Sequence, residues 1–201
     1  MPGAAAERRM TVAEFLTWDD GTDTRYELID GVPVAMAPSR RVHGILQARL
    51  AALLDSALKG REPCAAVTEA GIAINADAQD FYIADIAITC EADHRESSFA
   101  SAPILIVEVL SATTDADVRT VKLPAYRRMP SVQEIVLLDS RRPFAEVHRR
   151  LDGDRGRDRW IVDLVVGVEA PLRLGSIAAQ TTLGELWRGL ADGDATGSAG
   201  R

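Results

Sequence analysis

Two acidic residues stand inside apolar segments that otherwise have the composition of buried strands. Glu108 interrupts "ILIVEVLS" (104–111), and Asp85 interrupts "FYIADIAIT" (81–89). Burying a lone carboxylate costs several kcal/mol unless it is paired, neutralised or bound to a cation. On adjacent strands the two side chains could meet at one point, and paired oxygen ligands suit Mg²⁺ or Mn²⁺. The two acids therefore indicate a metal site that could activate water and stabilise charge on a phosphate.

A lysine follows these acids along the chain. Lys122 lies in a segment, 114–129, that has a helical pattern but contains Pro124, which must kink the helix or start a second one in its first turn. The Lys122 ammonium could hold an attacking water or offset developing negative charge. Tyr126 would share its face if the segment is one helix. Taken singly, a strand acid usually faces solvent or pairs with arginine, and a helix lysine usually lies at the surface, so only the combination supports catalysis.

Local patterns predict the elements that position these residues. Residues 11–14 ("TVAE") and 182–185 ("TLGE") match the capping box that opens a helix. Residues 25–36 read as a hairpin that turns at Asp30-Gly31. Apolar residues recur at helical spacing from Val42 to Leu58, and Gly60 closes that helix. Strands are predicted at roughly 64–69, 71–75, 81–89, 103–110, 133–139, 144–151 and 159–166, with 152–159 as the turn before the last one. This order favours a mixed α/β or α+β core over a regular βαβ arrangement.

Composition fits one domain and excludes several classes of protein. The chain has 201 residues, of which 47% are hydrophobic and 26% charged, so one domain is expected over 11–190 between a flexible N-terminus (1–10) and a disordered tail (191–201). The net charge of −7 argues against a general nucleic-acid-coating protein, although it leaves room for an enzyme that meets DNA through a local basic patch. No GxGxxG, P-loop, GxSxG or HExxH pattern occurs.

The cellular compartment follows from what the sequence lacks. No apolar run approaches the length of a membrane span, and the N-terminus lacks the apolar stretch of a secretory signal. The two cysteines, Cys64 and Cys90, do not make a disulfide framework, which indicates a reduced, cytoplasmic protein.

Several short motifs resemble a known family when they are taken in order. "YELIDG", "VHGILQARL", "YIADIAI", "ILIVEVLS", "KLPAY" and "EIVLLD" are similar to motifs of the Uma-type restriction endonucleases, bacterial members of the PD-(D/E)XK nuclease superfamily. The resemblance spans roughly residues 11–190 and implies a restriction-endonuclease-like core, a central mixed β-sheet flanked by helices. The superfamily pattern places an acid after a proline and Glu-x-Lys on the next strand.

This chain departs from that pattern at two positions. Ala84 replaces the proline, which is not a ligand, and Leu110 stands where the strand lysine would be. The resemblance implies that Lys122 of "KLPAY" takes the lysine's place. It thus implies a catalytic set of Asp85, Glu108 and Lys122.

The resemblance also implies metal ligands and accessory residues. Asp85, Glu108 and the backbone carbonyl of Val109 would hold Mg²⁺ (or Mn²⁺). Glu27 is either an extra metal or water ligand or a hairpin residue facing solvent. His43 either joins the site or is a satisfied helix histidine, and Tyr126 is a further accessory candidate.

The implied reaction is attack of water on a DNA phosphodiester, leaving a 5′-phosphate, by a homodimer with no membrane association. A non-catalytic binding or assembly module that retains the fold is a second interpretation, which the acidic charge favours. A metal-dependent hydrolase of another phosphoester is a third.

Overall fold

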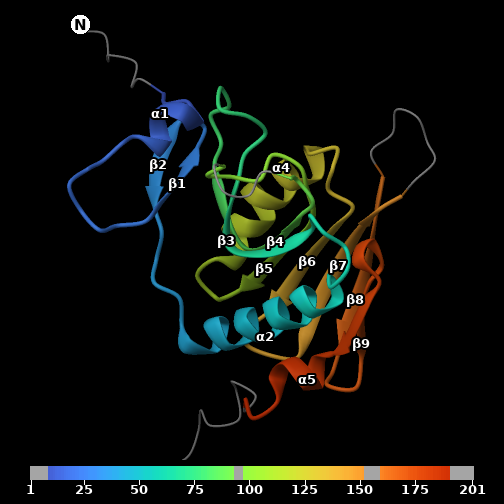
Figure 1. The fold of residues 1–201 in the computed structure, drawn as a ribbon. Coiled ribbons are helices and arrows are strands. Elements are labelled where there is room, and N and C mark those ends of the chain that lie inside the picture. The colour runs from blue at the N-terminus through green and yellow to red at the C-terminus, as the bar shows by residue number, and fades with distance from the viewer. Residues whose placement is uncertain (1–8, 93–96, 152–158, 191–201) are drawn as a thin grey trace, which may run out of the picture.

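The computed structural model describes residues 9–92, 97–151 and 159–190. Six strands form a central sheet in the order β3-β4-β5-β6-β7-β8 (Figure 1). Their bounds are β3 (Ala65–Ile72), β4 (Tyr82–Thr89), β5 (Pro103–Leu110), β6 (Glu134–Asp139), β7 (Phe144–Arg150) and β8 (Trp160–Val166). Strands β5 and β6 run parallel, and all other neighbours in this sheet run antiparallel. The predicted mixed sheet is confirmed.

Two small antiparallel sheets and short helices surround the central sheet. The hairpins pair β1 (Tyr26–Ile29) with β2 (Val32–Ala35), and β9 (Pro171–Leu174) with β10 (Ala179–Thr182). The helical segments are α1 (Val12–Leu16), α2 (Arg41–Ala57), α3 (Asp115–Asp117), the π-helical η1 (Val118–Lys122), α4 (Leu123–Arg128), the 3₁₀ segment η2 (Gly175–Ile177) and α5 (Leu183–Trp187).

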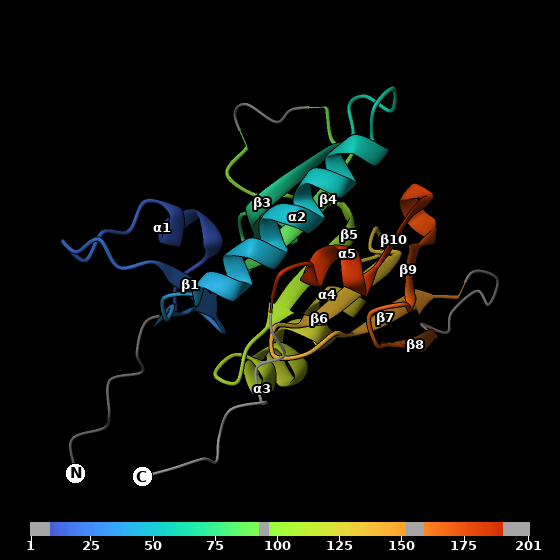
Figure 2. The same cartoon turned by 90° about the horizontal axis from the view of Figure 1, so that it is seen from below.

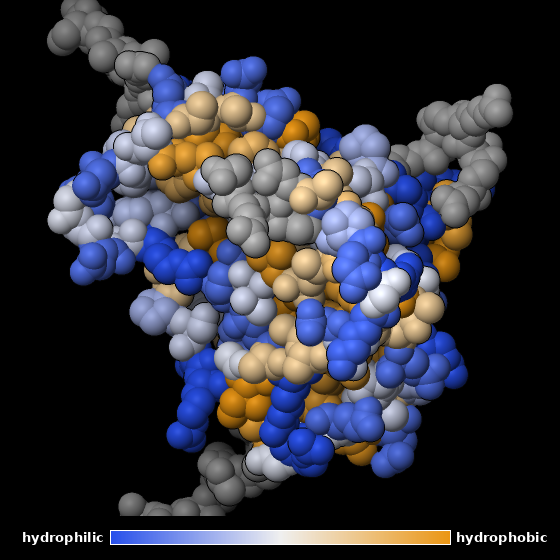
Figure 3. Space-filling model, in the orientation of Figure 1, coloured by the Kyte–Doolittle hydropathy of each residue, from blue (hydrophilic) through white to orange (hydrophobic). Residues whose placement is uncertain are grey.

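The sheet is covered on both faces. The leucines of α2 and the apolar residues of α5 pack on one face, where Val107 and Val136 are buried with them. The segment from α3 to α4 covers the other face, with Tyr126 packed among Ile106 and Ile135 (Figure 2). On the face drawn in Figure 3, hydrophilic residues dominate and an apolar patch lies over α1. No helix in the described segments is long and apolar enough to cross a membrane.

Most local predictions are confirmed. Thr11 and Thr182 both cap helices through complete capping boxes. Asp30 and Gly31 have φ angles of 50° and 75°, as a tight two-residue hairpin turn requires. Pro124 lies in the first turn of α4, so the second helix begins there, after the π-helical segment.

Three predictions of secondary structure need correction or extension. One strand, β3 (Ala65–Ile72), stands where two were predicted at 64–69 and 71–75, because pairing with β4 continues through Ala70 although Glu69 adopts a left-handed φ of 51°; residues 73–75 lie outside it. The β9–β10 hairpin was not predicted from its short strands. The predicted turn at 152–159 and the predicted flexible ends (1–10 and 191–201) lie wholly or mostly outside the described residues.

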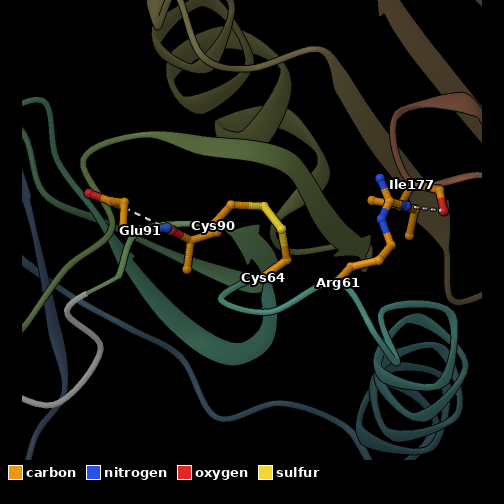
Figure 4. Close-up of a disulfide and its surroundings, with 6 residues drawn as sticks. Arg61, Cys64, Cys90, Glu91 and Ile177 are labelled. Carbon is orange, nitrogen blue, oxygen red and sulfur yellow. Dashed lines mark hydrogen bonds between the residues drawn. A yellow bond between two sulfur atoms is a disulfide. The ribbon is translucent and has the colours of Figure 1, made fainter.

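The cysteines are paired, contrary to expectation. The β3–β4 register places Ala65 opposite Thr89, so Cys64 and Cys90 face each other just beyond the paired residues. A disulfide joins them across 26 positions of sequence (Figure 4). Counting cysteines missed this bond because it depends on strand register. The pairing removes the cysteines as an argument for a reduced compartment.

Candidate functional site

The site forms where β4 and β5 stop pairing. Their ladder runs from Thr89 and Pro103 to Ile86 and Val107, and the next position on each strand is Asp85 and Glu108. Beyond this point the backbone groups of β4 find other partners. The Ile83 N–H donates to Glu27 Oε1 (2.8 Å), and the Ile83 carbonyl accepts from Lys122 Nζ (3.0 Å).

Glu108 lies at the floor of the site. Only 3% of the residue is exposed, and its Oε1 accepts a 2.7 Å hydrogen bond from the Tyr126 hydroxyl and a 3.3 Å bond from Lys122 Nζ. Its Oε2 has no partner among the described residues. Burial raises the pKa of Glu108 to about 7, although the Lys122 charge and the Tyr126 hydrogen bond act in the opposite direction.

Lys122 is buried, which corrects the expectation of a surface lysine without a packing role. Its residue exposure is 8%, and its ammonium lies 2.7 Å from Glu27 Oε1 and 3.3 Å from Glu108 Oε1. Burial alone would lower its pKa, but the attraction of Glu108 and Glu27 outweighs burial and raises it. Lys122 is therefore a buried cation held between two carboxylates. Glu27 is buried, so its interpretation as a hairpin residue facing solvent is wrong, while its role as a metal or water ligand stays a prediction.

Asp85 is held by the long helix and by the neighbouring strand. Its Oδ1 lies 2.8 Å from His43 Nε2, and its Oδ2 accepts a 2.6 Å hydrogen bond from the Val109 N–H. The hydrogen bond between His43 and Asp85 raises the pKa of His43, because it favours the protonated imidazole. His43 is thus part of the site as well as satisfied within it. Val109 reaches the site through its backbone, while its side chain packs in the core under α2.

Gln47 is a residue that sequence reasoning missed. Its Nε2 donates to the Asp85 carbonyl (2.8 Å) and to Glu69 Oε1 (2.6 Å), which ties α2 to both β3 and β4. It lies four residues after His43, so both fall on one face of α2. The four-residue spacing from His43 was the sequence signal that could have identified Gln47.

These groups surround a cavity of about 200 Å³. Glu27, Asp85, Glu108 and Lys122 line it, and part of its wall is apolar and comes from the β1–β2 hairpin. Tyr126 is not part of the lining and acts on Glu108 from behind. The structure therefore brings together every predicted site residue, six of them at the cavity and Tyr126 next to it.

The donor set is suitable for a hard divalent cation. The free Oε2 atoms of Glu27 and Glu108, together with Asp85, offer carboxylate oxygens at one cavity, and Mg²⁺ commonly uses one or two carboxylates and completes its shell with water and phosphate. No group of three or more His, Cys, Asp or Glu side chains in the described segments is placed to hold a metal ion together. The residues thus fit an open Mg²⁺ site with two protein carboxylates.

Two proteins of Synechocystis are similar to this chain over most of their length. The chain is 28% identical to the uncharacterized protein slr1290 of Synechocystis over 185 residues, covering 91% of this chain and 94% of that protein. It is 25% identical to the uncharacterized protein sll1609 of Synechocystis over 172 residues, covering 84% and 94%.

A solved structure shares the fold. The crystal structure of a protein from Anabaena variabilis, described as a putative nuclease belonging to DUF820, superposes with a TM-score of 0.69 at 18% identity, covering 89% of this chain and 97% of that one. Residues 12–171 match the Uma2 family, described as "putative restriction endonuclease", and because this match spans most of the sequence, the chain belongs to that family.

Proposed function

We propose that the chain is a divalent-metal-dependent endonuclease that hydrolyses DNA phosphodiester bonds at the cavity between β4 and β5. One observation carries the proposal: two carboxylates from diverging strands, Asp85 and Glu108, line one cavity with a buried lysine beside them. Family membership supports the same conclusion.

Asp85 and Glu108 would hold the cation, with the carbonyl of Val109 as a further ligand. A bound Mg²⁺ would lower the pKa of a coordinated water and stabilise negative charge on the phosphate. Lys122 Nζ, already oriented by Glu27 and by the Ile83 carbonyl, would hold the attacking water or offset charge at the phosphate. His43 and Gln47 would keep Asp85 in place, and Tyr126 would keep Glu108 in place. The product would carry a 5′-phosphate.

The site buries several charged side chains beside one another. A buried ion pair is weak evidence for stability, since its desolvation cost often exceeds the attraction. Here four carboxylate side chains (Glu27, Asp85, Glu108 and Asp117) line one cavity with two basic ones (His43 and Lys122), so negative charge remains for a cation to neutralise. This excess of carboxylate distinguishes the cluster from a balanced structural salt bridge.

The test is nicking of supercoiled plasmid and cutting of single-stranded DNA in Mg²⁺ or Mn²⁺. Wild type should cut in metal and be inactive in EDTA. Asp85→Asn and Glu108→Gln should each lower the rate by about a hundredfold or more, the usual effect of removing one preorganised charge. Asp77→Asn is the matched control, because Asp77 is exposed and does not line the cavity.

Metal binding needs a readout that does not depend on activity. Thermal unfolding with and without Mn²⁺ should show a stabilised wild type, since a ligand that binds only the native state stabilises it. Asp85→Asn should lose that shift and keep its metal-free stability, because an asparagine can still accept from Val109 N–H and contact His43. A large loss of metal-free stability would instead make Asp85 a structural partner of His43.

A binding or assembly module is the second candidate, and one observation favours it. Both carboxylate oxygens of Asp85 already have partners without a ligand, namely His43 and Val109. Oε1 of Glu108 likewise has Lys122 and Tyr126 as partners. If wild type binds DNA in Ca²⁺ but cuts no DNA in Mg²⁺ or Mn²⁺, this second function replaces the first. Hydrolysis of a small phosphodiester without DNA cleavage would favour a hydrolase of another phosphoester.

A further inference from the structure

The edge strand β8 exposes an unusual amount of apolar surface. Four of its seven residues are large apolar side chains that are more than a third exposed: Ile161 (41%), Val162 (43%), Leu164 (63%) and Val166 (66%). Val162, Leu164 and Val166 alternate along the strand, so they form one stripe on one face of the sheet. Such a stripe on an unpaired edge is a template for association with another strand.

The backbone of β8 is also free to pair. All seven residues pair with β7 in a single register without a bulge, from Arg150 opposite Trp160 to Phe144 opposite Val166. On its outer side, no other described segment hydrogen-bonds to the strand. The strand contains no proline, lysine or arginine, the residues that usually protect an edge. β8 lies at the outer margin of the sheet in Figure 2.

The opposite edge of the same sheet is protected, which makes β8 exceptional. On β3, Glu69 breaks the extended backbone with a φ of 51° and is ion-paired with Arg25. The segment at Ala100 also covers the end of β3, where the Ala100 N–H donates to the Gly71 carbonyl at 2.8 Å. β3 therefore has a break in its extended backbone and a segment that covers its end, and the described residues give β8 neither of these features.

We propose that β8 is the interface through which two copies of this chain associate, by antiparallel pairing of β8 with its two-fold mate into a continuous twelve-stranded sheet. Because the stripe is apolar and uncharged, the same stripe on a second copy can pack against it, which gives the self-complementary contact that a two-fold interface requires. A nucleic-acid partner does not fit, because the stripe offers no cation. The proposal does not rest on the nuclease activity.

Charge selects the register of this pairing. Asp163 is the only charged residue of the strand; it is ion-paired with Arg149 of β7, and 54% of its side chain is exposed. A two-fold axis at Asp163 would place the two carboxylates opposite each other, which destabilises a strand pair. An axis at Leu164 instead pairs Leu164 with its mate and Val162 with the mate's Val166. Asp163 then faces the Val165 position, and the two carboxylates are separated.

The first experiment measures mass in solution by light scattering and sedimentation over a range of concentrations. Wild type should be a dimer at micromolar concentration. Leu164→Lys places two like charges at the two-fold axis and should weaken the dimer at least tenfold, while the exposed position leaves the protomer folded. Val67→Lys is the control, since Val67 is a 37% exposed valine on the protected edge strand β3. A monomeric wild type, or a dimer that Leu164→Lys does not weaken more than Val67→Lys does, overturns the proposal.

The second experiment tests the register by cross-linking. Residues directly opposite each other in antiparallel strands have Cα atoms about 4.5–5.5 Å apart, within the range that a disulfide spans. Leu164→Cys should therefore form a covalent dimer under mild oxidation, with the native thermal stability retained. Asp163→Cys and Val67→Cys should cross-link much less. Equal cross-linking at Val67→Cys would show random collision, and stronger cross-linking at Asp163→Cys would overturn the proposed register.

Discussion

Lys122 lies closer to Glu27, on the N-terminal hairpin, than to Glu108, on the central sheet. Its Nζ is 2.7 Å from Glu27 Oε1 and 3.3 Å from Glu108 Oε1. The same Glu27 oxygen also accepts the Ile83 N–H that β4 exposes where it leaves β5. The β1–β2 hairpin therefore contributes to the site, because its Glu27 accepts the Ile83 N–H of β4 and orients Lys122.

Replacing Lys122 should destabilise the protein strongly. Lys122→Met would leave Glu27 and Glu108 buried without their cation, and breaking a buried pair from one side typically costs about 3–5 kcal/mol. Urea unfolding gives the free energy directly. Lys59→Met is the control, because Lys59 is exposed and its loss should change stability by less than about 0.5 kcal/mol. Adding Glu27→Gln to Lys122→Met should restore part of the loss, and an unaffected Lys122→Met would contradict the buried pairing.

The stability of the metal-free protein should depend on pH through Glu108. Burial raises the pKa of Glu108 from 4.5 to about 7. The Lys122 charge and the Tyr126 hydrogen bond lower this pKa, while the charges of Asp85 and Glu27 raise it. Between these two pH values the native state holds a proton that the unfolded state has lost, so this group's stabilising contribution falls as pH rises through the window.

Glu108→Gln removes this titration while keeping the shape of the side chain. The variant and wild type should have similar unfolding free energies near pH 4.5. At pH 8 the variant should be more stable, by an amount on the order of 1 kcal/mol or more, since one pKa unit corresponds to about 1.4 kcal/mol. Urea unfolding in EDTA at both pH values measures the difference. A variant that is less stable at pH 8 would show that the attraction of Lys122 outweighs burial.

The sequence predicted the elements whose signals are local. The capping boxes at Thr11 and Thr182, the Asp30-Gly31 turn and the periodic α2 helix each depend on a few neighbouring residues, and all are present. The exceptional acids in two apolar strands, Asp85 and Glu108, also lie together at one cavity, as their pattern predicted. Such signals persist because burying a carboxylate is costly wherever it occurs.

What the sequence could not reveal depends on contacts between distant segments. The burial of Lys122 requires the hairpin that carries Glu27, nearly a hundred residues earlier in the chain. The end of the β4–β5 ladder at Ile86 and the Cys64–Cys90 bond follow from strand register. A single sequence gives periodicity along a strand, but it does not give the register between two strands.

The disulfide should contribute measurably to stability. It closes a loop with a sequence separation of 26, and chain-entropy arguments give about 3.5 kcal/mol for a loop of this size. The double variant Cys64→Ala/Cys90→Ala should lose about this much in urea unfolding, and dithiothreitol should affect wild type but not the variant. Asp85 lies in β4 several residues before Cys90 and does not contact the disulfide, so metal-induced stabilisation should persist in the double variant. Equal stability of oxidised and reduced wild type would contradict this contribution.

Tyr126→Phe should change how Glu108 titrates without dismantling the site. Tyr126 is fully buried, does not line the cavity, and donates to Glu108 Oε1 at 2.7 Å. This hydrogen bond favours the charged carboxylate, so its loss should raise the pKa of Glu108 further above its usual value. The midpoint of Mn²⁺-induced stabilisation should therefore move to higher pH, while saturating stabilisation at alkaline pH stays near that of wild type. Tyr82→Phe is the matched control, since Tyr82 packs edge-on against Tyr126 with ring centres 5.8 Å apart. A purely structural role for the hydroxyl would lower stability equally at all pH values and leave the midpoint where it is in wild type.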